Sequence, residues 1–105
     1  MGYTFFPAQV FNCPVSWDIT HESATQGYNT ATFVGSPFAC MIECTKRTDF
    51  TCVGFDYNYD PPSDYCFLSD TLAAAPGVVL LSLTDTDLYE QYIPPQCTKG
   101  TLSLN

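Results

Sequence analysis

Six cysteines constrain this chain of 105 residues more than any other feature. An even number of cysteines in a short, loop-rich sequence with a single histidine favours disulfide bonds over a metal site. Disulfides persist in oxidising surroundings, so we expect a secreted or extracellular protein. The length corresponds to one domain, and a domain of this size gains much from cross-links because its core is small.

Four of the six cysteines accompany the clearest helix and strand patterns in the chain. Ser36 followed by Pro37 predicts a helix start, because serine caps a backbone N–H and proline suits the first helical position. We expect this helix to span about residues 37–47. Alternating apolar residues then predict a strand at 52–59 and, after a Pro-Pro turn, a second strand at 64–69.

The remaining segments are expected to surround this helix and hairpin. The patterns predict strands at 14–19, 28–34 and 87–93, a polar loop at 21–26, a short helical turn at 72–75 and a buried apolar segment at 78–83. Three regions follow along the chain: an apolar N-terminal arm at 1–12, a domain at 13–97 and a tail at 98–105. The arm is expected to lie against the domain as an extended segment or edge strand.

Alternate side chains of a strand point to opposite faces of the sheet, so the sequence assigns each hairpin residue either to the helix side or to the opposite side. Phe55 and its neighbours of the same parity face the helix, so Asp56 and Asn58 are expected to point outward into solvent. On the second strand Cys66 and Leu68 face the helix, whereas Tyr65 and Phe67 face the other side.

The cysteine spacing restricts the disulfide pairing. Cys40 and Cys44 lie on one face of the expected helix with Cβ atoms roughly 5–6 Å apart. A disulfide needs roughly 3.5–4.5 Å, so these two do not bond to each other, although most of the fifteen pairings stay open. The order along the chain favours Cys44–Cys52, Cys40–Cys66 and Cys13–Cys97. The last of these bonds closes the domain near its two ends.

The same residues resemble the PAN/apple domain family. The matching positions are Cys40, Glu43, Cys44, Cys52, Gly54, Phe55, Tyr57, Asn58, Cys66 and Leu68, with Cys13 and Cys97 outside them. The resemblance covers residues 13–97. It implies a small disulfide-rich α+β fold, in which a curved antiparallel sheet of about five strands packs around one α-helix, and it implies the same nested pairing. It also implies a non-catalytic extracellular module that binds proteins or carbohydrates.

The net charge of -8, from eleven acidic and three basic side chains, bears on the partners. Such a surface repels phosphate backbones and anionic lipid headgroups, so we expect no nucleic-acid partner. No window holds the roughly 18 apolar residues that a membrane span needs, so we expect no membrane insertion. The adjacent pair Lys46 and Arg47 lies near the expected helix C-terminus, where the helix dipole favours cations.

Neither catalysis nor metal binding is favoured. His21 stands in a polar segment, Ser23 is too near it in sequence to act as its nucleophile, and the cysteines are expected in disulfides, so we expect no enzyme and no catalytic residue. The segment Asp56-Tyr-Asn58-Tyr-Asp60 resembles the start of a calcium loop. However, Pro61 stands where such a loop needs glycine, so we expect no metal and no cofactor.

Aromatic residues at the hairpin end offer a binding surface. The candidate ligand-binding residues are Tyr59, Asp60, Asp64, Tyr65 and Phe67. Aromatic faces beside carboxylates suit sugar rings and protein interfaces alike. In the alternative interpretation, these side chains only cover the sheet.

The leading hypothesis is therefore a non-catalytic extracellular recognition or adhesion module that binds a protein or glycan ligand. A second hypothesis is a matrix or adhesive component that self-associates through residues 1–12. A third is a secreted inhibitor or effector of a protease or receptor, with the loop at 60–65 as its contact.

Overall fold

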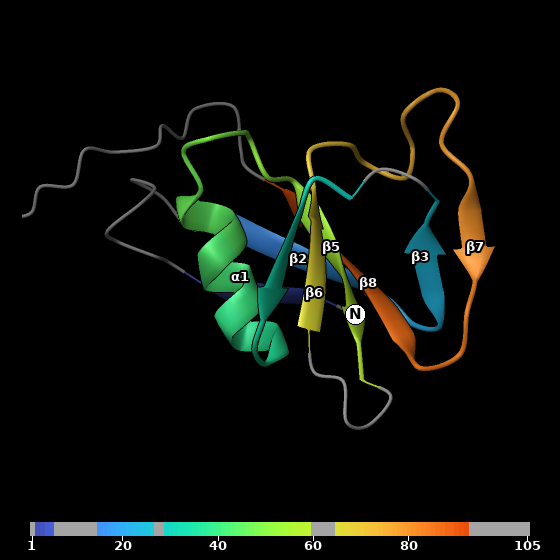
Figure 1. Cartoon of the computed structure of the whole chain (residues 1–105), viewed down its shortest axis with the longest axis horizontal. Helices are drawn as coiled ribbons and strands as arrows, with labels where there is room; N and C mark the ends of the chain where they lie inside the picture. The colour runs from blue at the N-terminus through green and yellow to red at the C-terminus, as the bar shows by residue number, and fades with distance from the viewer. Residues whose placement is uncertain (1, 6–14, 27–28, 60–64, 93–105) are drawn as a thin grey trace, which may run out of the picture.

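The computed structural model of the chain describes residues 2–5, 15–26, 29–59 and 65–92. It contains a larger antiparallel sheet with one α-helix on one face and a small two-stranded sheet on the other (Figure 1). The larger sheet has the strand order β1-β2-β8-β5-β6-β4, and the smaller sheet pairs β3 with β7. The elements are β1 Gly2–Phe5, β2 Val15–Thr20, β3 Ser23–Thr25, β4 Ala31–Val34, α1 Pro37–Lys46, β5 Gly54–Asn58, β6 Tyr65–Ser69, β7 Leu80–Ser82 and β8 Thr86–Tyr92.

This architecture confirms the α+β fold expected from the sequence, with an antiparallel sheet packed on one helix. Five strands of the larger sheet, β2, β8, β5, β6 and β4, lie within the region that carries the resemblance. Strand β1 adds a sixth at the edge, where Gly2 pairs with Asp18 and Phe5 with Val15 of β2. Residues 6–12 of the expected arm and the expected tail at 98–105 lie outside the described residues.

Helix α1 begins where the sequence predicts. The Ser36 side chain accepts a hydrogen bond from the Ala39 N–H at 3.2 Å, and Pro37 occupies the first helical position. The buried side of the helix carries Cys40, Met41, Cys44 and Thr45. The start of the helix follows from local chemistry, because the capping serine satisfies a backbone N–H that the helix itself leaves unpaired.

The core lies between α1 and the larger sheet. Trp17, Phe55 and Leu68 are at most 1% exposed. The Phe55 ring lies 5.5 Å from the Trp17 ring and stacks on Tyr89 with centroids 4.8 Å apart. Such aromatic pairs contribute roughly 0.5–1.5 kcal/mol beyond the area they bury. They join the three adjacent strands β2, β8 and β5 beneath the helix.

A polar contact also joins the helix to the sheet. The buried Thr45 hydroxyl donates to the Met41 carbonyl at 2.7 Å and accepts from the Gln91 amide of β8 at 2.9 Å. Strands β5 and β8 approach closely at Gly54, where a Cβ atom would lie 2.5 Å from the Tyr89 carbonyl oxygen. The glycine is therefore needed for this strand pairing.

Two disulfides cross-link the helix. Cys40 bonds to Cys66 of β6, and Cys44 bonds to Cys52 just before β5. These are the two inner pairings favoured by the sequence. Cys13 and Cys97 lie outside the described residues, so the outer bond stays a prediction.

Two segments differ from the sequence-based expectation. The expected polar loop at 21–26 contains strand β3, whose residues Ser23–Thr25 are all buried. The expected buried segment at 78–83 contains β7 and is not buried, since Val79 just before the strand is 51% exposed and Leu80 within it is 50% exposed. Polarity alone misassigned both segments, because β3 is covered by the larger sheet whereas β7 lies outside β3 with one side open to solvent.

The expected helical turn at 72–75 is wrong in type. The Ala75 N–H donates to the Leu72 carbonyl and the Val78 N–H to the Ala75 carbonyl, which are turn contacts without a helix. Pro76 and Gly77 interrupt the backbone there, and Gly77 adopts φ +84. The predicted strand at 28–34 is shorter in the structure, where β4 begins at Ala31.

Candidate functional site

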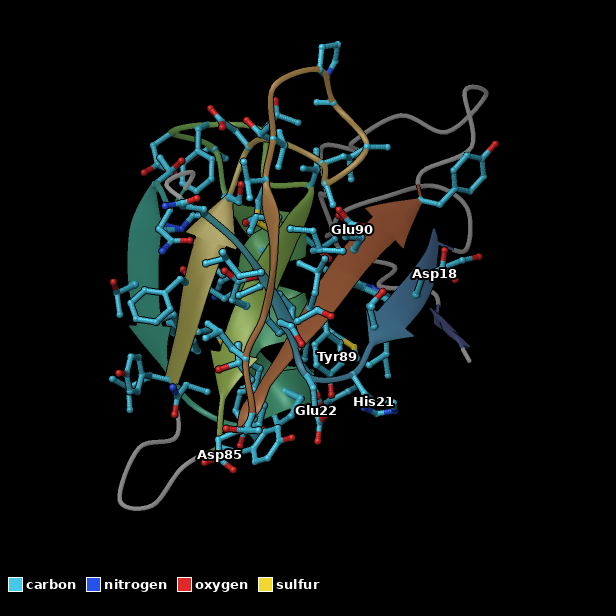
Figure 2. The ribbon with its side chains drawn as sticks, turned by 90° about the vertical axis from the view of Figure 1, so that its right-hand side faces the viewer. Asp18, His21, Glu22, Asp85, Tyr89 and Glu90 are labelled. Carbon is cyan, nitrogen blue, oxygen red and sulfur yellow. A yellow bond between two sulfur atoms is a disulfide. The ribbon has the colours of Figure 1, made fainter. Side chains whose placement is uncertain are left out.

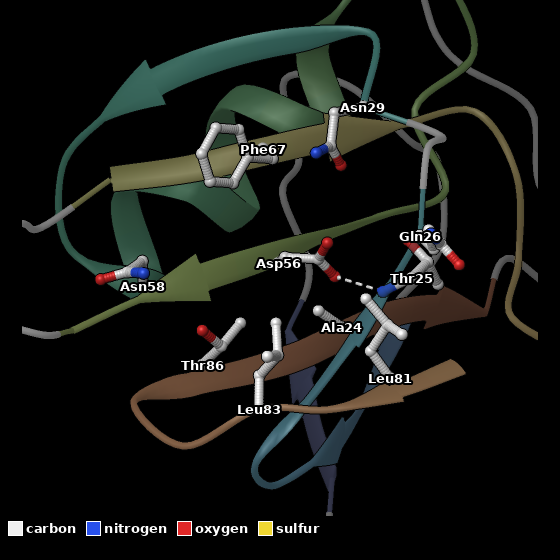
Figure 3. A pocket seen from close by; sticks show the side chains of 10 residues that line it. All are labelled: Ala24, Thr25, Gln26, Asn29, Asp56, Asn58, Phe67, Leu81, Leu83 and Thr86. Carbon is white, nitrogen blue, oxygen red and sulfur yellow. Dashed lines mark hydrogen bonds between the residues drawn. The ribbon is translucent and has the colours of Figure 1, made fainter. Parts of the chain in front are cut away.

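A cavity of about 260 Å³ lies between the two sheets on the side away from α1, and we call it the intersheet pocket (Figure 3). Its polar lining consists of Thr25, Gln26, Asn29, Asp56, Asn58 and Thr86. Its apolar lining consists of Ala24, Phe67, Leu81 and Leu83. None of these ten residues is basic. The volume lies just below the roughly 300 Å³ at which small-molecule sites in proteins begin, and far above the space of one water.

Strand register positions the lining. Asp56 of β5 stands opposite Phe67 of β6, and Asn58 stands opposite Thr86 of β8. Directly opposite residues of antiparallel strands share a face. These four side chains therefore lie on the face opposite Phe55 and the helix, and strand β3 crosses above them with Thr25 nearest Asp56.

Asp56 is the central polar group of the pocket. It points away from the helix as expected, but it is only 3% exposed because β3 covers it, so the expectation that it is solvated is wrong. One carboxyl oxygen accepts a hydrogen bond from the Thr25 N–H at 3.3 Å. The second oxygen has no hydrogen-bond partner among the residues that the structure describes.

Burial controls the charge of this carboxyl group. Desolvation raises the pKa of Asp56 from 3.8 to about 7, the Thr25 hydrogen bond opposes the rise, and the nearby charge of Glu90 adds to it. The group therefore changes its protonation near neutral pH, as carboxyl groups at functional sites commonly do.

Side-chain amides flank Asp56 along the strand direction. Asn58 lies toward the Thr86 end of the pocket, and Gln26 and Asn29 lie toward the other end (Figure 3). Both Gln26 and Asn29 are exposed, and neither side-chain amide bonds to another residue within the described part of the chain. Each amide offers two donors and one acceptor oxygen, so both are available to a polar ligand.

The ligand-binding residues expected from the sequence are only partly brought together. Tyr65 and Phe67 share a face with ring centroids 5.0 Å apart, and Phe67 lines the pocket. Tyr59 lies apart from them, since its ring pairs with Tyr57 at 6.0 Å on the helix side of β5. Asp60 and Asp64 lie outside the described residues.

A second polar group of side chains surrounds Asp87, at a corner formed by the turns next to β3 and β8. Asp87 accepts a hydrogen bond from the Glu22 N–H at 3.0 Å, and it lies 3.2 Å from His21 Nδ1. Figure 2 shows His21, Glu22 and Asp85 at this corner. Desolvation first, and then the carboxylates Asp87, Glu22 and Asp85, raise the pKa of the Tyr59 hydroxyl.

The side chains at this corner have a structural role, which is to hold the turn at Glu22. Glu22 has a left-handed backbone with φ 54, and Asp87 stabilises the turn by accepting its N–H. His21 thus contacts a carboxylate that is already used by the backbone. The Ser23 hydroxyl donates to the His21 backbone carbonyl at 3.1 Å and not to the imidazole ring. No other hydroxyl or thiol of the described residues bonds to the His21 ring, so these residues do not assemble a triad there.

The basic residues of the helix end also have local partners. Glu43 lies 3.8 Å from Lys46 and 3.3 Å from Arg47. Arg47 further approaches Asp49 at 3.5 Å and lies over the Phe50 ring. These contacts agree with a structural role for the pair, and they lie at the C-terminal end of α1, on the other side of the larger sheet from the intersheet pocket.

Most pocket residues could not be found from the sequence. Gln26, Asn29 and Thr86 stand in separate segments, and no local pattern links them to Asp56. Only Phe67 was among the expected ligand-binding residues. The Thr25–Asp56 contact spans 31 positions, so it depends on how β3 folds over the sheet.

An antiparallel sheet on one helix, with two disulfides to the helix and a small pocket, defines a disulfide-stabilised α+β domain of the kind found in extracellular modules. Residues 13–93 match the PAN domain family, which is well over half of the chain, so the chain belongs to this family. Its members are non-catalytic modules of extracellular proteins that bind proteins or carbohydrates.

A search of curated proteins finds no significant match. Within the described ranges, no helix has the length and apolar character required to cross a bilayer. No group of three or more histidine, cysteine, aspartate or glutamate residues suited to a metal ion occurs among the side chains that the structure describes.

Proposed function

We propose that this chain is a secreted, non-catalytic recognition module that binds an extracellular protein or glycan at the intersheet pocket. The observation that carries the proposal is the pocket itself, where a buried carboxyl group and exposed amides stand beside an apolar wall. Apolar walls with a few convergent polar groups are typical of ligand sites. The PAN family supports the class of function, and the pocket supports the place.

A pair of leucine substitutions tests the place of binding. Leu83 lines the pocket and is 43% exposed, whereas Leu72 is 41% exposed and does not line it. Leu83→Arg adds a long charged side chain at the rim, and Leu72→Arg makes the same change elsewhere. Both sites are open enough to accept arginine without disturbing the core.

Binding of the chain to a glycan array and to a panel of extracellular proteins is the measurement. We expect Leu83→Arg to weaken any captured ligand by roughly tenfold or more, and Leu72→Arg to bind as the unchanged chain does. Equal binding by both variants would place the ligand elsewhere. Hydrolytic turnover without any captured ligand would reject a recognition module.

Self-association through the N-terminal arm is a second candidate function. Strand β1 is an edge strand of the larger sheet, so its outer backbone groups are not paired with another described strand. Such an edge is suited to pairing with a second chain. Sedimentation of the full chain and of a chain lacking residues 1–12 tests this, and two monomers would reject it.

The inhibitor or effector hypothesis rests on the loop at 60–65. Residues 60–64 lie outside the described residues, so this hypothesis is supported by the sequence alone. An alanine scan of the loop against a captured protease or receptor tests it. Unchanged affinity across the scan would discard this hypothesis.

A further inference from the structure

We propose that the intersheet pocket binds one neutral sugar ring, with the inward-facing oxygen of Asp56 accepting a hydrogen bond from a ring hydroxyl. This inference rests on the proposed function, because it names the ligand class of the same pocket. Three observations support it: the partnering of Asp56, the distribution of the other polar groups, and the charge of the lining.

The hydrogen bonds of Asp56 leave one acceptor for a ligand. Its first oxygen accepts from the Thr25 N–H, and its second has no partner among the described residues. The residue is 3% exposed, and it lines the cavity. The second oxygen is not among the fully enclosed polar atoms that lack a partner, so it is open to the cavity. A ligand hydroxyl that donates to this oxygen gains a well-placed hydrogen bond in a largely desolvated site.

The other lining groups match the alternating surfaces of a sugar ring. Amides stand toward the two ends, Asn58 at one and Gln26 with Asn29 at the other (Figure 3). Phe67 forms the wall on β6, and the leucines of the β7 segment form the facing wall. Hydroxyl groups around a ring suit the amides, and the C–H faces of the ring suit the aromatic and aliphatic walls.

The charge of the lining favours a neutral ligand over an anionic one. None of the ten described lining residues is basic, and the net charge of the chain is -8. Lys46 and Arg47 lie on the helix side with Glu43, so they offer no compensation inside the pocket. An anionic sugar would place its carboxylate near Asp56 and Glu90 without a partner, which is unfavourable in a partly desolvated site.

The test is a titration of the ¹⁵N-labelled full chain, followed by the backbone amide signals in NMR spectra. The probes are the methyl glycosides of glucose, galactose, mannose and N-acetylglucosamine, and methyl glucuronoside as the anionic counterpart. We expect saturable shifts at Thr25, Asp56 and Phe67 with at least one neutral glycoside. Methyl glucuronoside should bind roughly tenfold more weakly or worse.

Two variants and a matched control test the role of Asp56. In Asp56→Asn the carbonyl oxygen stays with the Thr25 N–H, so the NH₂ group faces the cavity and the acceptor is lost. We expect roughly tenfold weaker binding, and a smaller loss for the exposed Asn29→Ala. Asp49→Asn removes the same charge beyond the helix end and should bind as the unchanged chain does.

The outcomes separate this inference from the proposed function. If no neutral glycoside gives saturable shifts, yet Leu83→Arg abolishes capture of an array ligand or protein, the sugar-ring inference is wrong and the proposed function stands. If glycosides shift only signals of α1 or β1, the pocket is not the site and both fail. Equal affinity of Asp56→Asn and Asp49→Asn would overturn the role of Asp56.

Discussion

At the scale of single residues, the free-energy cost of burying Asp56 links the stability of the fold to its pocket. An ionised carboxylate loses its hydration beneath β3 and regains only one hydrogen bond from the Thr25 N–H. The pKa of Asp56 is accordingly raised from 3.8 to about 7, with Glu90 as the charged neighbour that adds to the rise. The folded state therefore holds this proton more tightly than the unfolded chain does.

Stability should fall as the pH rises through this interval. Between pH 4 and 7 the unfolded chain has released the Asp56 proton while the folded chain retains it, so each step upward in pH disfavours folding. At 1.36 kcal/mol per pKa unit the total reaches on the order of 2–4 kcal/mol by pH 8. Asp56→Asn removes this contribution. Thermal unfolding at pH 4.5 and pH 8 should show the variant gaining stability relative to the unchanged chain at the higher pH.

The difference in stability between Asp56→Asn and the unchanged chain, measured at each pH, cancels the contributions of the other titrating groups. Asp49→Asn, at an exposed carboxyl group, serves as the control and should run parallel to the unchanged chain. Parallel curves for Asp56→Asn as well would show that the folded and unfolded pKa values of Asp56 are alike.

At the scale of elements, helix α1 is held by an N-terminal cap and by two disulfide bonds. The Ser36 hydroxyl satisfies the Ala39 N–H, and the buried side of the helix carries both cysteines that bond outward. No acidic residue lies in the first turn to offset the helix dipole. The cap is therefore a main stabilising contact of the helix N-terminus.

Ser36→Ala should lower the free energy of unfolding by about 1 kcal/mol, because the alanine side chain accepts no hydrogen bond. Ser36→Gly should cost only a few tenths, because glycine leaves the N–H open to water. Urea unfolding of the three proteins measures both values. A larger loss in the glycine variant would show that Ser36 acts through its backbone conformation.

The two described disulfides should contribute unequally. Cys40–Cys66 closes 26 positions and Cys44–Cys52 closes 8. The loop-entropy relation gives about 3.5 kcal/mol for the longer loop and about 2.5 kcal/mol for the shorter one. Double alanine variants of each pair, compared by urea unfolding, should follow this order. The reverse order would mean that packing around Cys44 and Cys52 outweighs chain entropy.

At the scale of the whole molecule, we predict that the two remaining cysteines link segments near its two ends. Cys13 and Cys97 are the pair left once the inner bonds are formed, and we predict that they bond to each other. Peptide mapping under non-reducing conditions should recover a Cys13–Cys97 linked peptide and no free thiol. A linkage of either cysteine to Cys40, Cys44, Cys52 or Cys66 would contradict the nested order.

Much of the larger sheet and its helix could be predicted from the chain. The start of α1, the hairpin of β5 and β6, and the assignment of Cys66 and Leu68 to the helix side follow from capping, alternation and cysteine spacing. These signals are local, so each is complete within one turn or one strand. They also carried the family resemblance, which the match of residues 13–93 bears out.

The pocket depended on contacts that no local pattern records. Asp56 has the alternation of a solvent-facing residue, and the polar residues of β3 have the composition of a loop. Both are buried because β3 pairs with β7, far along the chain, and this small sheet covers β5. Whether a side chain such as Asp56 is buried therefore depends on the element that covers it in the folded chain.

The amino-acid sequence alone thus determined the family, the helix with its two cysteines, and the hairpin, since each arises from neighbours in the chain. Only the tertiary structure decided which face of that hairpin holds a site. The second sheet folds over the larger one through pairings between distant segments, and it converts the surface around Asp56 into a pocket. Long-range strand pairing sets burial, and burial sets the chemistry of that carboxyl group.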